Sequence, residues 1–446
     1  MNDSLIIQPF SKPVSGSVQL PGSKSITNRT LALAAISGSK VTLEGALFSE
    51  DTRIMVDSLQ KLGFSVQDDE TAKSITIEGR SGTIPNAEAE LYVGNAGTAA
   101  RFLTALLCLR DGGCYDLDGS PAMRERPMRG LLDALEKHGA CKVTYKGKDG
   151  HFPFTLETKG LSGGYLEVDA SASSQILSAL LIVAPLAEGE PLIVNILGET
   201  VSHPFIDMTL GMMEQFGEDP EIGGHTGPFK FRCGPYTAPG ASYQIEPDAT
   251  AASYFMALPW VVGGELLLPK CGHIELQGDI RFLDVLGQLG GSFDEESGTL
   301  QVKYPHRLID GFTQNFNPIS DTFLTLAALS PLLNTELTIT GIAHTRKQET
   351  DRIAAMATEL EKLGQNVTET EDSLTVHPDV EAMIALTKDA PLGIDTYHDH
   401  RVAMSFGILG CYDLHGDGRP WLEIHNPACC AKTFPNFFDV LESLRS

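Results

Sequence analysis

Hydrophobic and polar positions follow a pattern that recurs six times along the chain, roughly every 70 to 80 residues. In each copy a short polar opening leads into a segment that is apolar on every side, as at residues 31–36 and 177–182. A β-branched stretch and an amphipathic helix follow. A helix that is apolar all round belongs in a core, whereas a helix with one charged face lies at a surface. The pattern therefore predicts sheets wrapped around buried helices, the inverse of an ordinary α/β barrel.

The polar openings and the amphipathic helices define the predicted element boundaries. The openings, which we expect to be the N-termini of the buried helices, cover residues 23–29, 94–98, 169–175, 246–250, 319–322 and 397–401. The amphipathic helices are predicted over residues 51–63, 127–139, 204–217, 278–290, 350–364 and 435–446. Five of these six end on Gly, which adopts the left-handed conformation of a helix C-cap at little cost.

The length of 446 residues predicts two domains with three copies each, because one ordinary core does not grow that large. The chain stops within the amphipathic helix of the sixth copy, so the strands that should close this copy are missing. The strand-like segment 5–20 is the predicted replacement. We therefore expect one domain over residues 21–245 and a discontinuous domain over residues 1–20 and 246–446.

The composition limits the kinds of partner that we expect the protein to bind and the cell compartment in which we expect it. The formal net charge of −25 argues against nucleic acid and against an anionic membrane. Neither a secretion signal nor an apolar run long enough for a bilayer is recognisable, which favours a cytoplasmic protein. The eight cysteines show no spacing typical of disulfides or of metal sites. A small anion remains a plausible ligand, since charges are screened over about 8 Å at physiological salt.

Cationic and hydroxyl side chains gather at four of the six openings. They are Lys24, Ser25 and Arg29; Gly97, Thr98 and Arg101; Ser173, Ser174 and Gln175; and His400 with Arg401. A helix N-terminus offers unpaired N–H groups and a positive dipole end, so added cations make it a site for phosphate or carboxylate. The alternative for a single Ser or Asp is an ordinary N-cap.

Several familiar motifs are absent. The Gly22–Ser25 segment ends like a phosphate-binding loop but lacks the Gly-x-x-x-x-Gly-Lys spacing, and no Gly-x-Gly-x-x-Gly follows a predicted strand. His398 and His400 could bind a metal. Without further ligands at suitable spacing, we favour a structural role or a role in an anion site for them.

The ordered motifs resemble those of the enolpyruvyl transferase family over essentially the whole chain. They are residues 20–25 with Asn28-Arg29, 94–99, Glu125-Arg126-Pro127, Ser173-Ser174-Gln175, Glu349-Thr350-Asp351-Arg352, Asp399-His400-Arg401 and 431–435. Within the family, the sequence is most similar to the branch that uses shikimate 3-phosphate. The resemblance implies a two-domain inside-out α/β barrel with six βαβαββ-type repeats, three per domain, and an active site in the interdomain cleft. It also implies transfer of the enolpyruvyl group of phosphoenolpyruvate to the 5-hydroxyl of shikimate 3-phosphate.

The resemblance also implies roles for individual residues. The matched phosphoenolpyruvate contacts are Lys24, Gly97, Arg126, Gln175, Arg352, Arg401 and Lys432. The matched shikimate 3-phosphate contacts are Lys24, Ser25, Arg29, Ser173, Ser174, Gln175, Ser202, Asp321 and Gln348. Asp321 is the expected general base, with Glu349 and Lys24 as the groups that exchange a proton with the methylene carbon. No metal and no organic cofactor is implied.

Some matched positions depart from the family pattern or have a simpler interpretation. Gln348 stands where Lys is common, and Phe205 stands where Tyr is common. Phe102 replaces the usual Pro, and we expect this change to weaken binding of the inhibitor glyphosate. For Asp321 the alternative role is a helix N-cap, and for Glu349 it is an acidic residue in the first turn of a helix.

Two other functions remain open at this point. One is the sister reaction, in which the acceptor is UDP-N-acetylglucosamine; that branch has a Cys on a mobile loop, where this chain has residues 120–126 without Cys. The other is a phosphometabolite-binding protein without turnover. We expect a monomer whose partners are small substrates, with domains held open by repulsion among their cations until anions bind.

Overall fold

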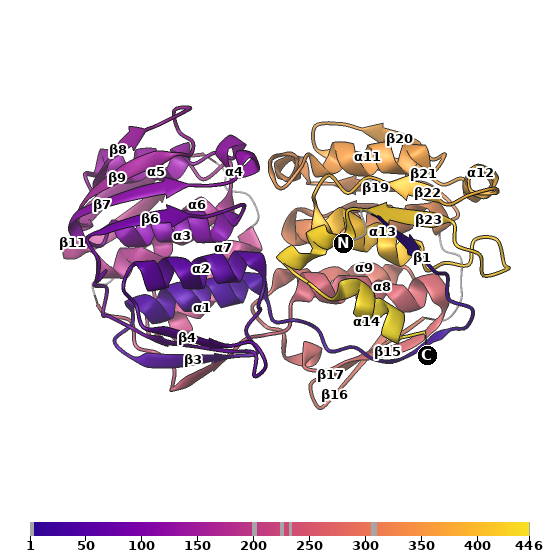
Figure 1. Cartoon of the computed structure of the whole chain (residues 1–446), viewed down its shortest axis with the longest axis horizontal. Helices are drawn as coiled ribbons and strands as arrows, with labels where there is room; N and C mark the ends of the chain where they lie inside the picture. The colour runs from indigo at the N-terminus through magenta and orange to yellow at the C-terminus, as the bar shows by residue number, and fades with distance from the viewer. Residues whose placement is uncertain (1–3, 199–202, 224–226, 232–233, 305–309, 446) are drawn as a thin grey trace. The chain divides into compact units, whose positions relative to one another are not determined.

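The computed structural model describes residues 4–198, 203–223, 227–231, 234–304 and 310–445. The chain forms two compact units (Figure 1). The N-terminal unit is Gly22–Glu246, and the C-terminal unit combines Met1–Pro21 with Pro247–Ser446. Helices and mixed sheets alternate in both units, so the predicted α/β class is confirmed.

Six buried helices follow the polar openings. They are α1 (Lys24–Ile36), α3 (Gly97–Leu107), α6 (Ser174–Val183), α8 (Ala249–Val262), α10 (Phe323–Leu329) and α13 (His400–Leu409). Four of them begin as predicted, with Ser23, Ser173, Asp248 or Asp399 as an N-cap whose side chain accepts from a backbone N–H of the first turn. The fifth opening differs, because residues Asn317–Thr322 form the 3-10 segment η4 before α10 begins.

The second set of helices carries the predicted glycine caps. These helices are α2 (Glu50–Lys61), α5 (Arg129–His138), α7 (His203–Gln215), α9 (Phe282–Gln288), α11 (Arg352–Lys362) and α14 (Phe437–Ser443). The five glycines that follow the first five of them have φ between 80° and 89°, which confirms the left-handed C-caps. Helix α9 is shorter than predicted, since residues Gly278–Arg281 form the 3-10 segment η3. The short helices α4 (Pro121–Glu125) and α12 (Val380–Leu386) complete the set described here.

The described residues form six sheets, three in each unit. In the N-terminal unit the strand orders are β14-β3-β5-β4, β6-β7-β9-β8 and β10-β11-β13-β12; in the C-terminal unit they are β2-β15-β17-β16, β18-β19-β21-β20 and β22-β23-β1. In every sheet the first two strands are parallel and the later pairs are antiparallel.

The sequence predicted strand-like stretches after the buried helices without residue bounds, and the structure gives these bounds. In the N-terminal unit they are β3 (Lys40–Glu44), β4 (Val66–Asp69), β5 (Ser74–Glu78), β6 (Glu88–Tyr92), β7 (Asp111–Asp118), β8 (Cys141–Tyr145), β9 (Phe154–Lys159), β10 (Ser162–Val168), β11 (Glu188–Ile196), β12 (Glu221–Ile222), β13 (Phe229–Lys230) and β14 (Ser242–Gln244). In the C-terminal unit they are β1 (Ser4–Ile7), β2 (Val14–Ser17), β15 (Gly264–Leu268), β16 (Ser292–Glu296), β17 (Thr299–Tyr304), β18 (Thr313–Asn315), β19 (Leu337–Thr340), β20 (Asn366–Glu369), β21 (Ser373–His377), β22 (Leu392–Ile394) and β23 (Leu422–His425).

Two strands are exchanged between repeats where the chain passes from one unit to the other. Strand β2 precedes α1 but pairs in parallel with β15, which follows α8. Strand β14 precedes α8 but pairs with β3, which follows α1. Strand β1 pairs with β23 and so completes the sheet of the sixth copy. The prediction for the N-terminal segment is therefore confirmed for β1 and wrong for β2, whose backbone is paired with the fourth copy.

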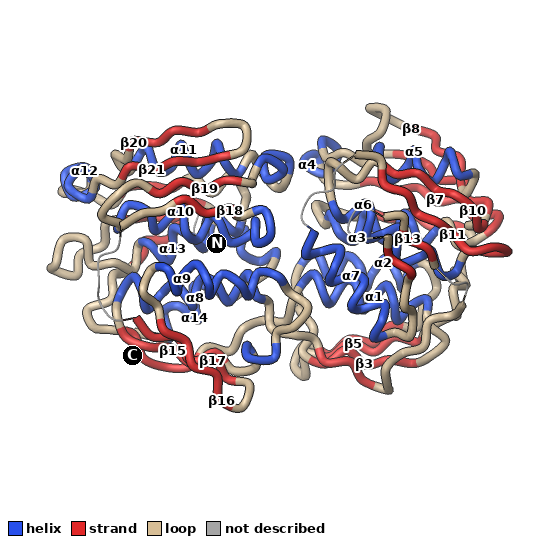
Figure 2. Tube along the Cα trace, turned by 180° about the vertical axis from the view of Figure 1, so that it is seen from behind, coloured by secondary structure: helices blue, strands red, loops and turns tan. Residues whose placement is uncertain are grey.

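Within each unit, helices lie between sheets (Figures 1 and 2). In the N-terminal unit, α1, α2, α3 and α6 lie between the sheet of β3 and the sheet of β7. In the C-terminal unit, α8 and α13 lie between the sheet of β15 and the sheet of β19. The buried helices are apolar on every side because sheets and other helices cover them on every side. The seven cysteines that the structure describes are free thiols, five of them buried.

Candidate active site

Arg352, the first residue of α11, lies at the centre of a network of buried charges in the C-terminal unit. The residue is 1% exposed. Its Nε lies 2.7 Å from Asp399 Oδ2, its Nη1 lies 3.0 Å from Asp321 Oδ1, and its Nη2 lies 2.9 Å from Glu349 Oε2. Nη1 also donates to Gln348 Oε1. Residues from three separate parts of the sequence thus meet on one guanidinium group.

These partners keep Arg352 charged. Burial alone lowers the pKa of a guanidinium, but the carboxylates of Asp399, Glu349 and Asp321 outweigh burial and raise the pKa of Arg352 above its ordinary value. A buried ion without partners costs several kcal/mol, so the carboxylates are a condition for placing Arg352 here. Asp351, the N-cap of α11, fixes the point at which the helix begins.

Arg401, the second residue of α13, shares Asp321 with Arg352. Its Nη2 lies 2.7 Å from Asp321 Oδ2. Asp399 Oδ1 accepts from the backbone N–H of Arg401 at 2.9 Å and so caps α13. Burial lowers the pKa of Arg401, but Asp321 and other acidic groups raise it well above its ordinary value. The two oxygens of Asp321 are therefore each held by a guanidinium.

Lys432, the last residue of the 3-10 segment η7 (Pro427–Lys432), completes the network through Glu349. Lys432 Nζ lies 2.8 Å from Glu349 Oε1, so Glu349 bridges Lys432 and Arg352. The side chains of Glu349 and Lys432 are only 11% and 9% exposed. Three cations and three carboxylates therefore alternate in this cluster. Within the C-terminal unit, these carboxylates offset the positive charges of Arg352, Arg401 and Lys432.

The helix-terminal interpretations of Asp321 and Glu349 are wrong. Asp321 lies inside η4, and the N-cap of α10 is Thr322. Glu349 precedes the N-cap Asp351 by two residues and so lies outside α11. An N-cap must directly precede the first helical residue and a first-turn acid must lie within the first helical residues, and the sequence does not show where a 3-10 segment ends and a helix begins. Both carboxylates instead pair with Arg352.

In the N-terminal unit, Lys24 opens α1 as predicted. Its Nζ lies 3.5 Å from Asp51 Oδ2, at the start of α2. The side chain of Asp51 is buried, and that of Lys24 is 13% exposed. The N-cap Ser23 accepts from the N–H of Ile26 at 3.4 Å. Lys24 is thus fixed by a helix start and by a carboxylate that we did not predict from the sequence.

Arg29, one turn further along α1, is held by protein groups. It donates from Nε to Thr209 Oγ1 at 2.8 Å and from Nη2 to the carbonyl of Phe205 at 3.1 Å and Ser178 Oγ at 3.3 Å. Its guanidinium carbon lies 5.3 Å from the ring centroid of Phe102 and 5.9 Å from that of Phe205. Burial lowers the pKa of Arg29 to about 9. Phe102 and Phe205, the two aromatic residues that depart from the family pattern, therefore both lie against Arg29, which is a predicted ligand contact.

Gly97, the first residue of α3, lies directly beneath two arginines. A Cβ at this position would come within 2.7 Å of Arg126 Nη2 and 2.9 Å of Arg101 Nη1. Arg101 Nη2 donates to the carbonyl of Pro127 at 2.9 Å and thereby holds the segment that carries Arg126. The absence of a side chain at Gly97 lets the Arg126 guanidinium lie against the N-terminus of α3.

The N-terminus of α6 carries three further predicted contacts. Ser173 is the N-cap, and its Oγ accepts from the N–H of Gln175 at 3.2 Å. Ser174 is buried. Gln175 Oε1 is buried and accepts no hydrogen bond from the described part of the chain. Ser202, the remaining predicted contact, lies outside the described residues.

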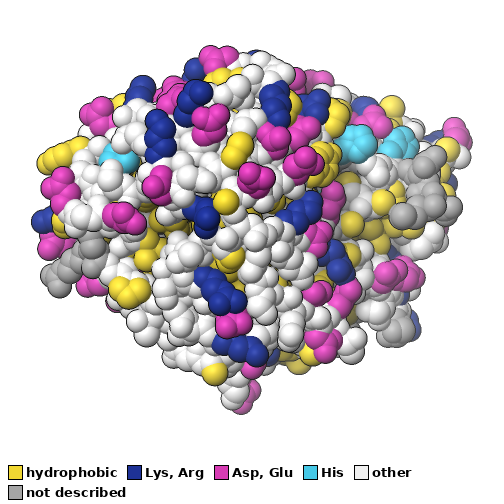
Figure 3. All heavy atoms as spheres, turned by 60° about the vertical axis from the view of Figure 1, so that its left-hand side comes forward, with side chains coloured by type: hydrophobic (Ala, Val, Ile, Leu, Met, Phe, Trp, Pro, Cys, Tyr) yellow, Lys and Arg dark blue, Asp and Glu magenta, His cyan; other side chains and the backbone are white. Residues whose placement is uncertain are grey.

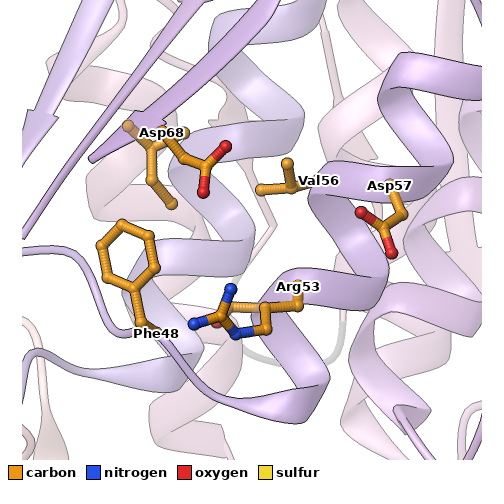
Figure 4. A pocket seen from close by; sticks show the side chains of 7 residues that line it. Phe48, Arg53, Val56, Asp57 and Asp68 are labelled. Carbon is orange, nitrogen blue, oxygen red and sulfur yellow. The ribbon is translucent and has the colours of Figure 1, made fainter. Parts of the chain in front are cut away.

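A small pocket in the N-terminal unit contains none of the predicted residues (Figure 4). It has a volume of about 150 Å³ between α2 and the hairpin β4–β5 and is lined by Phe48, Thr52, Arg53, Val56, Asp57, Asp68 and Ile75. Arg53 already pairs with Glu70 at 2.5 Å, and its guanidinium carbon lies 5.7 Å from the ring of Phe48. We assign no chemistry to this pocket.

The structure gives supporting roles to three residues for which the sequence predicted no ligand contact. Asp399 and Asp51 are buried partners of Arg352 and Lys24, and Arg101 supports Arg126. Asp399 was predicted as part of a helix opening, and an acid directly before a helix is typical of an N-cap, but its ion pair with Arg352 was not predicted. In the described residues no three His, Cys, Asp or Glu side chains lie in a geometry that could hold a metal ion.

Comparison with known proteins gives one consistent family. The model of the family described as EPSP synthase (3-phosphoshikimate 1-carboxyvinyltransferase) matches residues 9–441. A 3-phosphoshikimate 1-carboxyvinyltransferase of Opitutus terrae is 50% identical, covering 99% of this chain and 98% of the relative. Another of Trichormus variabilis is 39% identical, covering 98% of each chain.

Solved structures share the fold. An EPSP synthase from Acinetobacter baumannii superposes with a TM-score of 0.77 at 24% identity, covering 98% of this chain and 97% of that one. The enolpyruvyl transferase NikO from Streptomyces tendae superposes with a TM-score of 0.73 at 17% identity, covering 99% of this chain and 97% of that one. At these identities the likeness concerns the fold alone.

Proposed function

Because the chain belongs to the EPSP synthase family of 3-phosphoshikimate 1-carboxyvinyltransferases, we propose a division of that reaction among its residues. The activity transfers the enolpyruvyl group of phosphoenolpyruvate to the 5-hydroxyl of shikimate 3-phosphate and releases phosphate. A bond forms between the 5-oxygen and C2 of phosphoenolpyruvate, and the bond from C2 to the phosphate oxygen later breaks. The hydroxyl loses a proton, while C3 gains one and then returns one.

Asp321 is the proposed base for the 5-hydroxyl, and the Arg352 network is the observation that carries the proposal. Arg352 and Arg401 hold both carboxylate oxygens of Asp321 in place at 3.0 Å and 2.7 Å. A general base must be oriented before it can accept a proton efficiently. The same two cations are proposed phosphoenolpyruvate contacts, so base and electrophile would be positioned by shared groups.

Glu349 is the proposed partner of Lys24 in proton exchange at C3. Glu349 already accepts from Arg352 and Lys432, and the cluster of three cations and three carboxylates has no excess positive charge. An arriving phosphoenolpyruvate anion adds negative charge beside Glu349, which favours its protonated form. A protonated Glu349 can then donate to the methylene carbon, and its carboxylate can take the proton back during elimination.

The remaining predicted contacts divide into two sets. Lys24, Gly97, Arg126, Gln175, Arg352, Arg401 and Lys432 are proposed to bind phosphoenolpyruvate. Lys24, Ser25, Arg29, Ser173, Ser174, Gln175, Ser202, Asp321 and Gln348 are proposed to bind shikimate 3-phosphate. Helix N-termini and arginine forks suit ligands that each carry a phosphate and a carboxylate. Each of the two units supplies one cluster of these residues, and we propose that both clusters act on the same pair of substrates.

We propose that Gln348 contributes less than the Lys common in the family. Its Oε1 accepts from Arg352, which leaves the amide N–H groups for a substrate hydroxyl. An amide donates a hydrogen bond but supplies no charge. Four N–H groups of Arg29 donate to Thr209, Ser178 and the carbonyls of Phe205 and Ser25, so the proposed ligand contact uses the second N–H of Nη1 or replaces one of these acceptors.

Architecture and partners complete the proposal. We propose that each unit is an inside-out barrel of three βαβαββ-type repeats, and that the protein is a cytoplasmic monomer without nucleic-acid or membrane partners. On the face that Figure 3 shows, Lys and Arg are scattered among Asp and Glu, which gives no continuous basic surface. No helix among the described residues is both long and apolar enough to cross a bilayer. Glyphosate is the proposed inhibitor, as a competitor of phosphoenolpyruvate.

The acceptor is the point that experiment should test first. Phosphate release from phosphoenolpyruvate should occur with shikimate 3-phosphate and not with UDP-N-acetylglucosamine. The second acceptor is disfavoured, because the loop that carries a Cys in the sister branch has none at residues 120–126 here. Equal release with both acceptors would contradict the proposal. Binding of both substrates without any release would instead indicate a binding protein.

A further inference from the structure

Asp279 is a buried carboxyl group outside the set of residues considered so far. It lies in η3, where its Oδ2 accepts from Thr250 Oγ1 of α8. The residue is 8% exposed. A buried carboxyl without a salt-bridge partner is uncommon, because the ionised form is poorly solvated in a protein interior. The burial of Asp279 in the core of the C-terminal unit is therefore unusual.

The surrounding segment holds Asp279 in place. Gln277 Oε1 accepts from the N–H of Ala249 at 3.0 Å, and Gln277 Nε2 donates to the carbonyl of Pro247 at 2.7 Å. These two bonds fix η3 to the N-terminus of α8. Segment η3 also packs against η4, which contains Asp321. Asp279 is thereby positioned near the proposed base by backbone and side-chain bonds that do not involve its own carboxylate.

Three charged groups of the C-terminal unit act electrostatically on Asp279. They are Asp321 of η4, Arg401 of α13 and Asp248, the N-cap of α8. Arg281 of the same segment is exposed. Arg401 thus interacts with Asp279 in addition to its direct pair with Asp321. The proton on Asp279 decides whether Asp279 adds its negative charge to those of Asp321 and Asp248, which also act on Arg401.

We propose that Asp279 is a positioning residue for Arg401 and Asp321, which sets through its own proton how strongly Arg401 attracts an anionic substrate. The inference rests on the proposed role of Arg401 in binding phosphoenolpyruvate. With Asp279 protonated, Arg401 retains positive potential for the ligand. With Asp279 ionised, the added negative charge weakens that potential and opposes the charge of Asp321.

The titration range of Asp279 falls where an enzyme assay can follow it. Burial is the main cause that raises the pKa of Asp279 from 3.8 to about 7, with Asp321 adding to the increase, while the Thr250 hydrogen bond and Arg401 lower it. Ionisation of Asp279 is therefore expected between about pH 6 and pH 8. Over this range the KM for phosphoenolpyruvate should rise with pH by about tenfold, the order expected for one added charge at an intermediate dielectric constant.

The test is the pH dependence of KM and kcat with saturating shikimate 3-phosphate. Asp279→Asn keeps the shape of the side chain but carries no titrating proton, so the rise in KM near pH 7 should disappear. Thr250→Val removes a bond that lowers the pKa of Asp279, so it should move the rise to higher pH. The control is Asp284→Asn, which changes an exposed carboxyl on the adjacent helix α9. Ionisation of the substrate phosphates, with pKa near about 6, is common to all variants.

Each outcome separates the inference from the proposed function. A residue with a merely structural role would change stability or kcat at every pH without moving the KM step. An unchanged step in Asp279→Asn would overturn the inference, and if that variant does not fold, an unmoved step in Thr250→Val would do so. A wild-type enzyme without a step would also overturn it. Failure of the proposed function would appear separately, as full turnover in Asp321→Asn.

Discussion

Arg352 Nη1 lies 3.0 Å from Asp321 Oδ1, so the first residue of α11 is joined to the segment that precedes α10, 31 residues earlier in the chain. The other side of the same guanidinium meets Asp399 and Glu349. One side chain therefore orients the proposed base, the proposed acid and the N-cap of α13. Changes at Arg352 should affect catalysis and folding together.

Arg352→Lys should lower kcat/KM by at least about a hundredfold and destabilise the protein by about 3–5 kcal/mol. Lys has one compact ammonium group and cannot reach four acceptors with fixed geometry, so it leaves buried carboxylates without a partner. Steady-state kinetics and chemical denaturation measure the two effects. Arg53→Lys is the control, since the exposed pair of Arg53 with Glu70 should contribute at most about 1 kcal/mol. Equal effects in both variants would contradict the role of the network.

Glu349→Gln should block proton exchange at the methylene carbon. The amide keeps one oxygen that can accept from Lys432 or Arg352, presents an NH2 group in place of the other oxygen, and cannot donate and recover an acidic proton. Incorporation of solvent deuterium at C3 of phosphoenolpyruvate, followed by mass spectrometry, should fall by about a hundredfold or more. Glu361→Gln on the exposed face of α11 is the matched control. Wild-type deuterium incorporation in Glu349→Gln would remove Glu349 from the proposed chemistry.

Gly97→Ala should raise the KM for phosphoenolpyruvate by about tenfold, equivalent to about 1.4 kcal/mol, with a smaller change in kcat. The added Cβ would lie 2.7 Å from Arg126 Nη2, so the guanidinium must move away from the start of α3. Gly287→Ala in α9 is the control, because its Cβ would meet its nearest neighbour at an ordinary 3.8 Å. An unchanged KM in Gly97→Ala would show that Arg126 does not bind the substrate from its present position.

Phe102→Pro should strengthen inhibition by glyphosate at a cost in stability. Phe102 is an interior residue of α3, and its ring lies against the guanidinium group of Arg29. Pro at this position would also remove a helix N–H group, which costs about 3 kcal/mol. Phe102→Leu removes the ring but keeps the N–H and so separates the two effects. The inhibition constant against phosphoenolpyruvate is the measurement. A constant that is the same in Phe102→Pro as in the wild type would refute the expected effect of Phe102.

Asp279 should make stability depend on pH. Its pKa is about 7 in the folded protein and near 3.8 in the unfolded chain, so the folded state holds the extra proton between these values. The contribution to the free energy of unfolding is fully present below about pH 4 and is lost as the pH rises through about 7. Between pH 5 and pH 8 the wild type should lose more stability than Asp279→Asn, as measured by chemical denaturation. Equal losses would indicate that Asp279 does not titrate in this range.

The sequence pattern predicted features that depend on neighbouring residues. The glycines after α2, α5, α7 and α11 adopt the expected left-handed caps, and Ser23, Ser173 and Asp248 begin their helices as N-caps. Each of these features is set within one helical turn by hydrogen bonding and backbone freedom. The sequence around each helix end was therefore sufficient to predict these caps.

Features that depend on distant residues could not be predicted in the same way. The alternative roles of Asp321 and Glu349 as helix-terminal acids rested on their local position in the sequence, whereas their ion pairs with Arg352, Arg401 and Lys432 form only in the folded chain. The exchange of β2 and β14 between repeats was not visible either, since a repeat pattern gives the type of a strand but not its partner. The burial of Asp279 likewise follows from the packing of η3 against η4.

The most direct test of the account is the rate of phosphate release in a single turnover of Asp321→Asn with both substrates. We expect release to fall by about a thousandfold, within the range for loss of a general base, while calorimetry shows shikimate 3-phosphate bound within about tenfold of the wild-type affinity. Asp439→Asn, an exposed position on α14, should react at the wild-type rate. Release at the wild-type rate in Asp321→Asn would contradict the assignment of the Arg352 network as the catalytic centre.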